Sequence, residues 1–361
     1  MLIGFTAGSD YVATPIANGA VEARHKLPPK DTLAGEWISN IGGTPVYYDF
    51  DPAGKKSFNG YVVGHQCVDV PGDIRDVAHG EGYYTGTENT FSSFSPCVIA
   101  GPATNTVQVS SDGKTAQWDS AGCSDCGPQT WTRAAPIWGF DTSQPANTKF
   151  LASKAITKLG HPRFVGQYLE YWQGAHDVIT PAAVTAIHAA HARIMLIANP
   201  RVRGNDLTTS RQAMTDANLA VNAARRLHAP DNVAIFRDVE NNYHITAAYV
   251  KAWVATITKN KYKAGFYENP RESGPESFTK AYCGAVQSNS AIPGQTVLFS
   301  DQPIDGTSQY ESQAPRWNPA SPVLGSCTSQ TIAWQYLLHR THAPPNADPD
   351  EALPGDLRYF W

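Results

Sequence analysis

Hydrophobic and polar positions follow different patterns on the two sides of residue 135. Before it, short segments rich in aromatic and β-branched residues alternate with turn signals, among them the Asp112-Gly113 pair of a predicted hairpin. After it, strand-like runs alternate with segments of helical periodicity, which is typical of parallel βα units. We therefore expect a β-rich domain over residues 1–135 and an α/β domain over residues 136–361.

Helix signals recur five times in the second half. Thr180 and Pro181 have the residue types preferred at the N-cap and the first helical position. A later segment places Met214, Ala217 and Val221 on one stripe, which predicts that this stripe is buried. The five predicted helices cover residues 148–160, 181–192, 209–227, 245–259 and 277–287.

Strand-like runs precede these helices and continue after the last one. They cover residues 136–143, 163–169, 193–200, 234–239, 263–269, 296–301 and 331–338. Five βα units followed mostly by strands are enough to close a barrel. In barrels of this kind, the functional face lies at the carboxyl ends of the strands.

Two acids lie one residue apart at the end of the fourth predicted strand. Strand side chains alternate between faces, so Asp238 and Glu240 are expected on one side, with Cα atoms roughly 7 Å apart. Such proximity raises one carboxyl pKa and suits acid/base chemistry. A solvated loop entrance or an ion pair with Arg237 also fits the pattern, although parity aims Arg237 at the helix layer.

Other acids also end predicted strands. Asp141 lies near the end of the first strand of the second half and Asp301 ends the sixth, while Asp348 and Asp350 come after the last. If the strands close into a barrel, these carboxylates meet at the same end as Asp238.

Composition narrows the function classes. Of 361 residues, 42% are hydrophobic and 17% are charged, and the formal net charge is −4, so no basic stripe indicates a nucleic-acid partner. No apolar run approaches the roughly 18 residues of a membrane span. The chain also lacks phosphate-binding glycine motifs, and we expect no nucleotide cofactor.

The six cysteines, at positions 67, 97, 123, 126, 283 and 327, include one CxxC pair without a second pair to complete a zinc site. We expect no metal centre. Disulfides within the first half and between Cys283 and Cys327 would place the protein in an oxidising compartment. Six reduced cysteines in a cytosolic protein are the alternative.

Three short motifs occur in the order and spacing of a known family. They are GFDTSQ at 139–144, IFRDVE at 235–240, and AWQY at 333–336 followed by Asp348. This half resembles the family 25 glycoside hydrolases, which are muramidase-type lysozymes, and their glycoside-hydrolase-like relatives among secreted bacterial proteins. The resemblance implies a TIM-like (β/α)5β3 barrel over residues 136–361.

The resemblance also implies site roles. Glu240 would be the general acid that protonates the leaving sugar oxygen, with Asp141, Asp238 and Asp348 as supporting acids. In that family the substrate's own acetamido group is thought to act as nucleophile, so Asp238 would orient it and stabilise charge. Either Asp348 or Asp350 matches the final aspartate of the family pattern.

Sugar sites commonly present aromatic rings beside a few polar groups. Tyr168, Tyr267 and Trp334 lie at predicted strand ends and, with Asp301, are candidate substrate-binding residues. We expect a secreted hydrolase of a cell-wall polysaccharide, chiefly peptidoglycan, with the first half as a binding or positioning module. The alternative is a catalytically silent barrel that binds glycan or a protein partner as a surface or assembly component.

Overall fold

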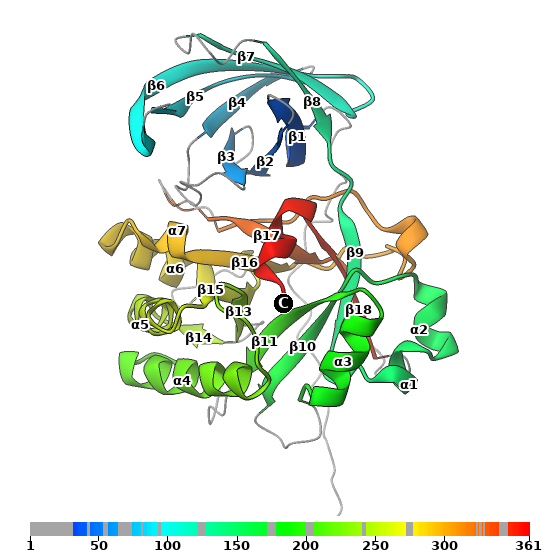
Figure 1. The fold of residues 1–361 in the computed structure, drawn as a ribbon. Helices are drawn as coiled ribbons and strands as arrows, with labels where there is room; N and C mark the ends of the chain where they lie inside the picture. Colours follow the sequence, from blue (N-terminus) through cyan, green and yellow to red (C-terminus); the bar gives the residue numbers. More distant parts are fainter. Residues whose placement is uncertain are drawn as a thin grey trace, which may run out of the picture.

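The computed structural model contains two curled β-sheets, one after the other along the chain (Figure 1). It describes residues 32–41, 44–52, 57–63, 74–80, 82–92, 95–121, 128–171, 178–199, 206–239, 243–271, 277–322, 324, 327, 329–338 and 346–361.

The first sheet is antiparallel throughout and curls until its first strand pairs with its last. The predicted hairpin at Asp112-Gly113 is present, with the Ser110 amide donating to the carbonyl of Thr115 at 2.9 Å. The strands are β1 (Gly35–Ile41), β2 (Thr44–Pro52), β3 (Ser57–Val63), β4 (Ile74–Gly80), β5 (Tyr83–Ser92), β6 (Ser95–Val109), β7 (Thr115–Ala121) and β8 (Gln129–Arg133).

Aromatic rings fill the inside of this first sheet. Trp131 stacks on Tyr48 with ring centroids 4.5 Å apart and on Trp118 at 5.7 Å. Trp37 is buried beside them, and the guanidinium of Arg133 lies 4.1 Å from its ring centroid. The alternation of aromatic and polar residues in the first half therefore corresponds to inward and outward positions.

The second sheet closes into an eight-stranded barrel in the order β10-β11-β13-β15-β16-β17-β18-β9. Its strands run parallel, except that β18 runs antiparallel to both neighbours. The predicted closed barrel is thus confirmed. Its strands are β9 (Ile137–Thr142), β10 (Phe164–Tyr171), β11 (Arg193–Asn199), β13 (Ala234–Val239), β15 (Lys263–Glu268), β16 (Thr296–Asp301), β17 (Thr331–Gln335) and β18 (Asp348–Ala352).

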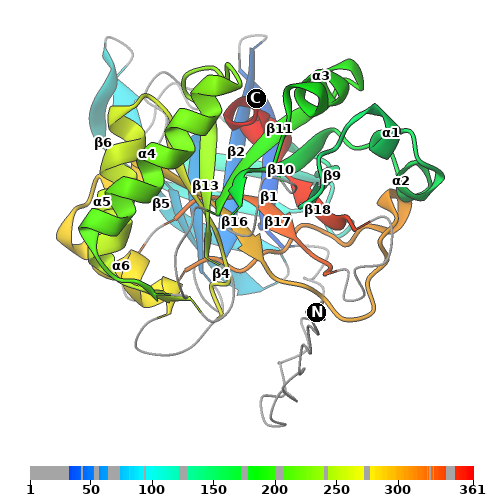
Figure 2. The ribbon, with the colours of Figure 1, turned by 90° about the horizontal axis from the view of Figure 1, so that it is seen from below.

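Helices cover the outside of the barrel, with α4, α5 and α6 on one side and α1 to α3 on the other (Figure 2). A small parallel pair of strands consists of β12 (Asp206–Leu207), just before α4 in the sequence, and β14 (His244–Ile245), just before α5. The helices are α1 (Thr148–Leu151), α2 (Lys154–Leu159), α3 (Pro181–Ala189), α4 (Ser210–Arg226), α5 (Ala247–Lys259), α6 (Phe278–Ser288) and α7 (Ile292–Gln295), with 3₁₀ turns η2 (Glu311–Gln313) and η3 (Pro354–Tyr359).

Threonine caps fix where the three central helices begin. The hydroxyl groups of Thr180, Thr209 and Thr246 each accept a hydrogen bond from the backbone amide three residues later. The predicted N-cap at Thr180 is confirmed. No helix in the described ranges is long and apolar enough to cross a membrane.

Two local predictions were wrong, and one strand was missed. The helix predicted over 148–160 is two short helices, because the Ser153 hydroxyl caps the Ile156 amide and starts a new one. Met214 is 51% exposed, whereas Ala217 and Val221 of the same predicted stripe are buried, together with Ala213 and Ala220. Strand β18 was not predicted.

The disulfide predicted between Cys283 and Cys327 is present and joins α6 to the long segment between β16 and β17. The pairing predicted within the first half involves cysteines whose side chains lie outside the described residues.

The first sheet sits on the amino end of the barrel strands (Figure 1). The linker at Ala134 leads directly into β9, and the Ala134 amide donates to the carbonyl of Glu36. The carboxylate of Glu36 also accepts the Gly355 amide of η3 at 2.8 Å. The carboxyl end of the barrel therefore faces away from this joint.

Candidate active site

Four barrel strands carry acidic side chains into the same end of the interior. Asp141 ends β9, Asp238 lies near the end of β13, and Asp301 ends β16. Asp348 opens the antiparallel strand β18 directly opposite Asp141, so the two side chains share a face. Because β18 runs against its neighbours, its amino end meets their carboxyl ends.

The other end of the interior is apolar. Phe164, Met195, Phe236 and Val297 face inward below the acids, and Phe360 closes the floor against Phe164 with ring centroids 5.2 Å apart. The acidic end therefore rests on a dry, tightly packed base.

A chain of hydrogen bonds crosses the acidic end and holds Asp141. The Tyr267 hydroxyl donates to Oε1 of Gln335 at 2.7 Å, and Nε2 of Gln335 donates to Oδ2 of Asp141 at 2.7 Å. The Tyr267 ring stacks on Phe299 at 4.3 Å, which fixes the hydroxyl in place. Gln335 is thereby oriented with its donor toward the carboxylate.

Asp238 has its own amide partner. Nδ2 of Asn199, at the end of β11, donates to Oδ2 of Asp238 at 2.8 Å. An amide donor stabilises the charged form of a carboxylate. This contact holds the Asp238 carboxyl group in one orientation.

The proximity of the acids opposes full ionisation. Burial raises the pKa of Asp141 well above its usual range, and the charges of Asp348, Asp238 and Asp301 raise it further, against the lowering effect of the Gln335 bond. Burial also raises the pKa of Asp350, with contributions from Asp141, Asp348 and Asp301. These shifts favour the protonated forms of Asp141 and Asp350, and a protonated carboxyl group is what acid catalysis requires.

Gly166 on β10 makes room for Asp141. A Cβ atom at this position would lie 2.5 Å from the Cβ of Asp141 and 3.0 Å from Cε of Met195. The absence of a side chain on β10 thus allows the acid to enter the interior from β9.

Arg237 points away from the acids into the helix layer, as parity predicted. Its Nε donates to the Tyr249 hydroxyl at 2.9 Å, and that hydroxyl donates to Oδ2 of Asp216 at 2.6 Å. Arg237 also donates to the carbonyl of Asp238 at 2.5 Å. It therefore anchors the backbone beside Asp238 without entering the acidic end.

The structure brings together Asp141, Asp238, Asp348 and Asp301, with Tyr267 among them. Tyr168 also faces inward, within the same apolar cluster as Tyr267. Trp334 is not brought to the acids: it faces outward, packs on Trp317 at 6.3 Å and donates from Nε1 to the carbonyl of Gln302. Glu240 lies outside the described residues.

Sequence reasoning missed the two amides that hold the acids. Asn199 and Gln335 carry no charge, and neither residue type by itself indicates a catalytic or metal-binding role. Their signal was positional, because each lies at the carboxyl end of a strand on the parity that faces inward. No cluster of three or more His, Cys, Asp or Glu residues suited to a metal ion occurs in the part of the chain the structure describes.

The family of this barrel follows from its sequence. The profile of the Rv2525c-like, glycoside hydrolase-like domain matches residues 154–340, more than half of the chain. The chain belongs to this Rv2525c-like, glycoside hydrolase-like family. No curated protein matches the sequence.

Three solved structures are similar to this chain to different degrees. An uncharacterized B. stearothermophilus protein is 29% identical, with a TM-score of 0.56, over 62% of this chain and 100% of its own. The Tat-secreted protein Rv2525c of Mycobacterium tuberculosis is 12% identical (TM-score 0.39; 61% and 96% covered). The modular autolysin LytC of Streptococcus pneumoniae is also 12% identical (TM-score 0.33; 87% and 66% covered). At these scores the last two likenesses do not bear on function.

The Rv2525c-like match confirms the predicted resemblance to glycoside-hydrolase-like proteins. It is a match to that family and not to family 25. The matched residues include Asp238, Glu240 and Asp301, whereas Asp141 and Asp348 lie outside them on β9 and β18. In this Rv2525c-like chain the acidic end is thus completed by strands on both sides of the matched region.

Proposed function

We propose that this protein hydrolyses glycosidic bonds in a cell-wall polysaccharide, with peptidoglycan as the principal substrate and a muramidase-type reaction related to that of family 25. The observation that carries the proposal is the gathering of Asp141, Asp238 and Asp348 at one end of a closed barrel. Membership of a glycoside hydrolase-like family supports the same chemistry.

In the proposed reaction, Glu240 donates a proton to the leaving sugar oxygen. Asp238 faces inward and Glu240 follows two residues later, so continued strand alternation would aim both at the substrate. Asp238, held by Asn199, orients the substrate's acetamido group and stabilises positive charge at the reacting carbon. Asp141 and Asp348, when ionised, would add negative charge beside the oxocarbenium-like transition state.

Substrate binding is assigned to the rest of the acidic end. Tyr267, Tyr168 and Asp301 would line the sugar subsite, and Trp334 would support it from behind through the wall formed by β17. We propose that the chain acts outside the cytoplasm, where the disulfide between Cys283 and Cys327 is stable. No cofactor enters the proposed reaction.

The element order supports assigning the barrel to the (β/α)5β3 type, because helices follow β9, β10, β11, β13 and β15 and then strands β16, β17 and β18 complete the ring. We propose a domain boundary near residue 135, with residues 1–135 binding or positioning the glycan and residues 136–361 acting on it. The joint at Glu36 supports a fixed rather than a free arrangement of the two.

The decisive experiment is release of soluble reducing ends from purified cell walls. Glu240→Gln should reduce the rate by roughly 10²–10⁴-fold, the usual contribution of a general acid. Glu351→Gln is the matched control, because Glu351 is a buried glutamate of β18 on the opposite parity from Asp348 and Asp350. Equal rates for the wild type and Glu240→Gln would reject the proposed role.

The burial of the acids favours a second candidate function. Asp141 and Asp238 are only 4% and 1% exposed, which also suits a barrel that binds glycan without cleaving it. Sedimentation with cell walls, measured beside reducing-end release, separates the two functions. Wall binding without release by the wild-type protein would select the silent barrel.

A further inference from the structure

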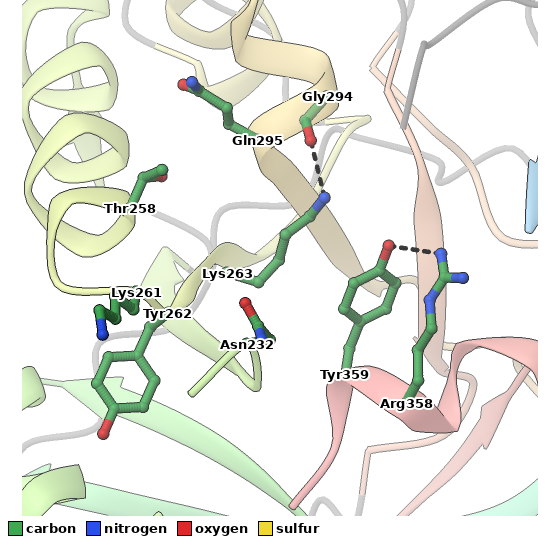
Figure 3. Close-up of a pocket in the computed structure, with 9 residues that line it drawn as sticks. All are labelled: Asn232, Thr258, Lys261, Tyr262, Lys263, Gly294, Gln295, Arg358 and Tyr359. Atoms are coloured by element: carbon green, nitrogen blue, oxygen red, sulfur yellow. Dashed lines mark hydrogen bonds between the residues drawn. The ribbon is translucent and has the colours of Figure 1, made fainter. Parts of the chain in front are cut away.

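A cavity lies at the opposite end of the barrel from the acids. Its volume is about 430 Å³, within the range of small-molecule sites. Lys263 begins β15 and Gln295 immediately precedes β16, so the cavity opens at the amino ends of these strands, beside η3 (Figure 3).

Three basic side chains line this cavity, and no acid is among its described lining residues. They are Lys261, Lys263 and Arg358, which come from the turn before β15, from β15 itself and from η3. Lys261 also lies 3.6 Å from Asp231 at the surface, so its charge is partly compensated. Lys263 and Arg358 come from two different elements and converge on the same cavity.

Lys263 is fixed in position. The residue is 9% exposed, and its ammonium donates to the carbonyl of Gly294 at 2.8 Å. An ammonium group has three protons and can donate to several acceptors at once. A nearly buried, oriented ammonium gains more from an anion than a solvated one does, because the local dielectric is lower.

Arg358 shares an aromatic ring with Lys263. The Tyr359 ring centroid lies 5.1 Å from Nζ of Lys263 and 4.6 Å from Cζ of Arg358, and Nη2 of Arg358 donates to the Tyr359 hydroxyl at 2.7 Å. Figure 3 shows Tyr359 between the two cations. Holding two like charges at one ring has an electrostatic cost that a bound anion would offset.

The carboxyl group of Glu36, at the joint between the two sheets, interacts electrostatically with Arg358. The Arg358 charge lowers the pKa of Glu36, but burial has the larger effect and brings that pKa to about 7. Glu36 is therefore partly protonated near neutral pH and neutralises Arg358 incompletely.

From these observations we infer that the cavity binds the phosphate group of a phosphorylated sugar or polyol. Phosphate offers several acceptor oxygens, which suit a point-charge lysine beside an arginine fork. The volume exceeds that of a phosphate alone, and Tyr262 and Thr258 provide a wall for the attached organic group. The phosphate belongs to either a free monoester or a phosphodiester polymer of the cell wall.

The test is calorimetric titration of the full chain with inorganic phosphate, glycerol phosphate and a polyol phosphodiester polymer, with citrate as a carboxylate comparison. Arg358→Gln and Lys263→Gln should each weaken phosphate binding by about tenfold or more. Lys251→Gln is the matched control, because Lys251 is exposed on α5 away from the cavity. It should bind as the wild type does.

The outcomes are distinct. Tighter binding of glycerol phosphate identifies a free monoester as the ligand, and tighter binding of the polymer identifies the wall; both support the site. Equal phosphate affinity in the wild type and Arg358→Gln would overturn it, as would citrate binding as tight as phosphate. Arg358 is half-buried, so its variant serves if Lys263→Gln fails to fold. Glycan hydrolysis should be unchanged in Arg358→Gln, so the result is independent of the proposed function.

Discussion

The two curled sheets of this chain fill their interiors in different ways. The antiparallel sheet packs aromatic rings inside, with Trp131 stacked between Tyr48 and Trp118. The helix-covered barrel is apolar at one end and acidic at the other, where Asp141 and Asp238 lie. In the described part of this chain, the interior filled by aromatic rings leaves no place for a reaction site, whereas the barrel interior has acidic side chains at one end.

The connection of the strands explains the difference. Successive strands of the antiparallel sheet run in opposite directions, so each end of the roll receives both strand beginnings and strand ends. In the barrel, seven parallel strands end on one side, and β18 is the single strand that begins there. Residues far apart in sequence, such as Asp141 and Asp348, are thus collected at one end.

The largest effect on stability is expected from the aromatic interior. Trp131→Ala should lower the free energy of unfolding by about 3–5 kcal/mol, because it removes a fully buried ring and leaves a cavity. Chemical denaturation measures this loss. Trp131→Phe should lose less, since a ring remains to stack on Tyr48.

Where Trp131→Ala is still folded, the variant should still hydrolyse glycan, because the acids belong to the other sheet. A large loss of activity in the folded variant would contradict this separation of roles.

The joint between the sheets is expected to weaken as the pH rises. Burial raises the pKa of Glu36 from 4.5 to about 7, so the folded protein holds a proton that the unfolded chain releases above 4.5. The stabilisation is complete below about pH 4.5 and is lost as the pH rises through 7, which amounts to roughly 3 kcal/mol at most.

Glu36→Gln removes this titration. The difference in unfolding free energy between variant and wild type should therefore favour the variant more at about pH 8 than at about pH 5. Asp49, directly opposite Glu36, also has its pKa raised, chiefly by burial and further by Asp356 and Glu36, so the variant lowers this pKa as well and the pH dependence changes in the same direction. A difference that does not change with pH would show that Glu36 is not protonated in the joint.

Crowding at Asp141 predicts a smaller loss of stability with a distinct effect on activity. Gly166→Ala places a methyl group 2.5 Å from the Cβ of Asp141, and such overpacking costs about 1–3 kcal/mol. The displaced carboxylate should also slow hydrolysis. Gly284→Ala is the control, since its new Cβ meets nothing nearer than 3.6 Å and should be neutral or stabilising.

The smallest effect is expected from the hydrogen bond that orients Gln335. Tyr267→Phe keeps the ring stack on Phe299 and loses the hydroxyl, at a cost of about 1 kcal/mol. The hydrogen bond from Gln335 lowers the pKa of Asp141, and a less ordered Gln335 weakens this effect. The pKa of Asp141 should therefore rise, and the acidic limb of the pH–rate profile should move to higher pH. Tyr310→Phe, at an exposed site, should leave the profile unchanged.

Much of the barrel was predictable because its signals are local. Helical periodicity located α5 with its buried Tyr249, Val250 and Trp253, and strand parity placed Arg237 in the helix layer. The gathering of Asp141, Asp238 and Asp348 followed from a single assumption, the closed barrel with its strand ends on one side.

The rest depends on contacts that local pattern does not encode. Strand β18 has the sequence DPDEA, whose proline and acids are unfavourable in strands, and only its pairing with β9 and β17 makes it one. Trp334 precedes the inward Gln335 and so faces outward, but β17 is buried on both sides, which removes the alternation that would have revealed this.

The bond between Cys283 and Cys327 spans 44 positions and fastens a long, mostly irregular stretch to the body of the barrel. By loop-closure entropy such a link restricts the unfolded chain by about 4 kcal/mol. Trp317, in the same stretch, rests against Trp334 on the outer wall of β17. Thiol reductants should therefore loosen the strand that presents Gln335 to Asp141, which would make the acidic end sensitive to the redox state of its surroundings.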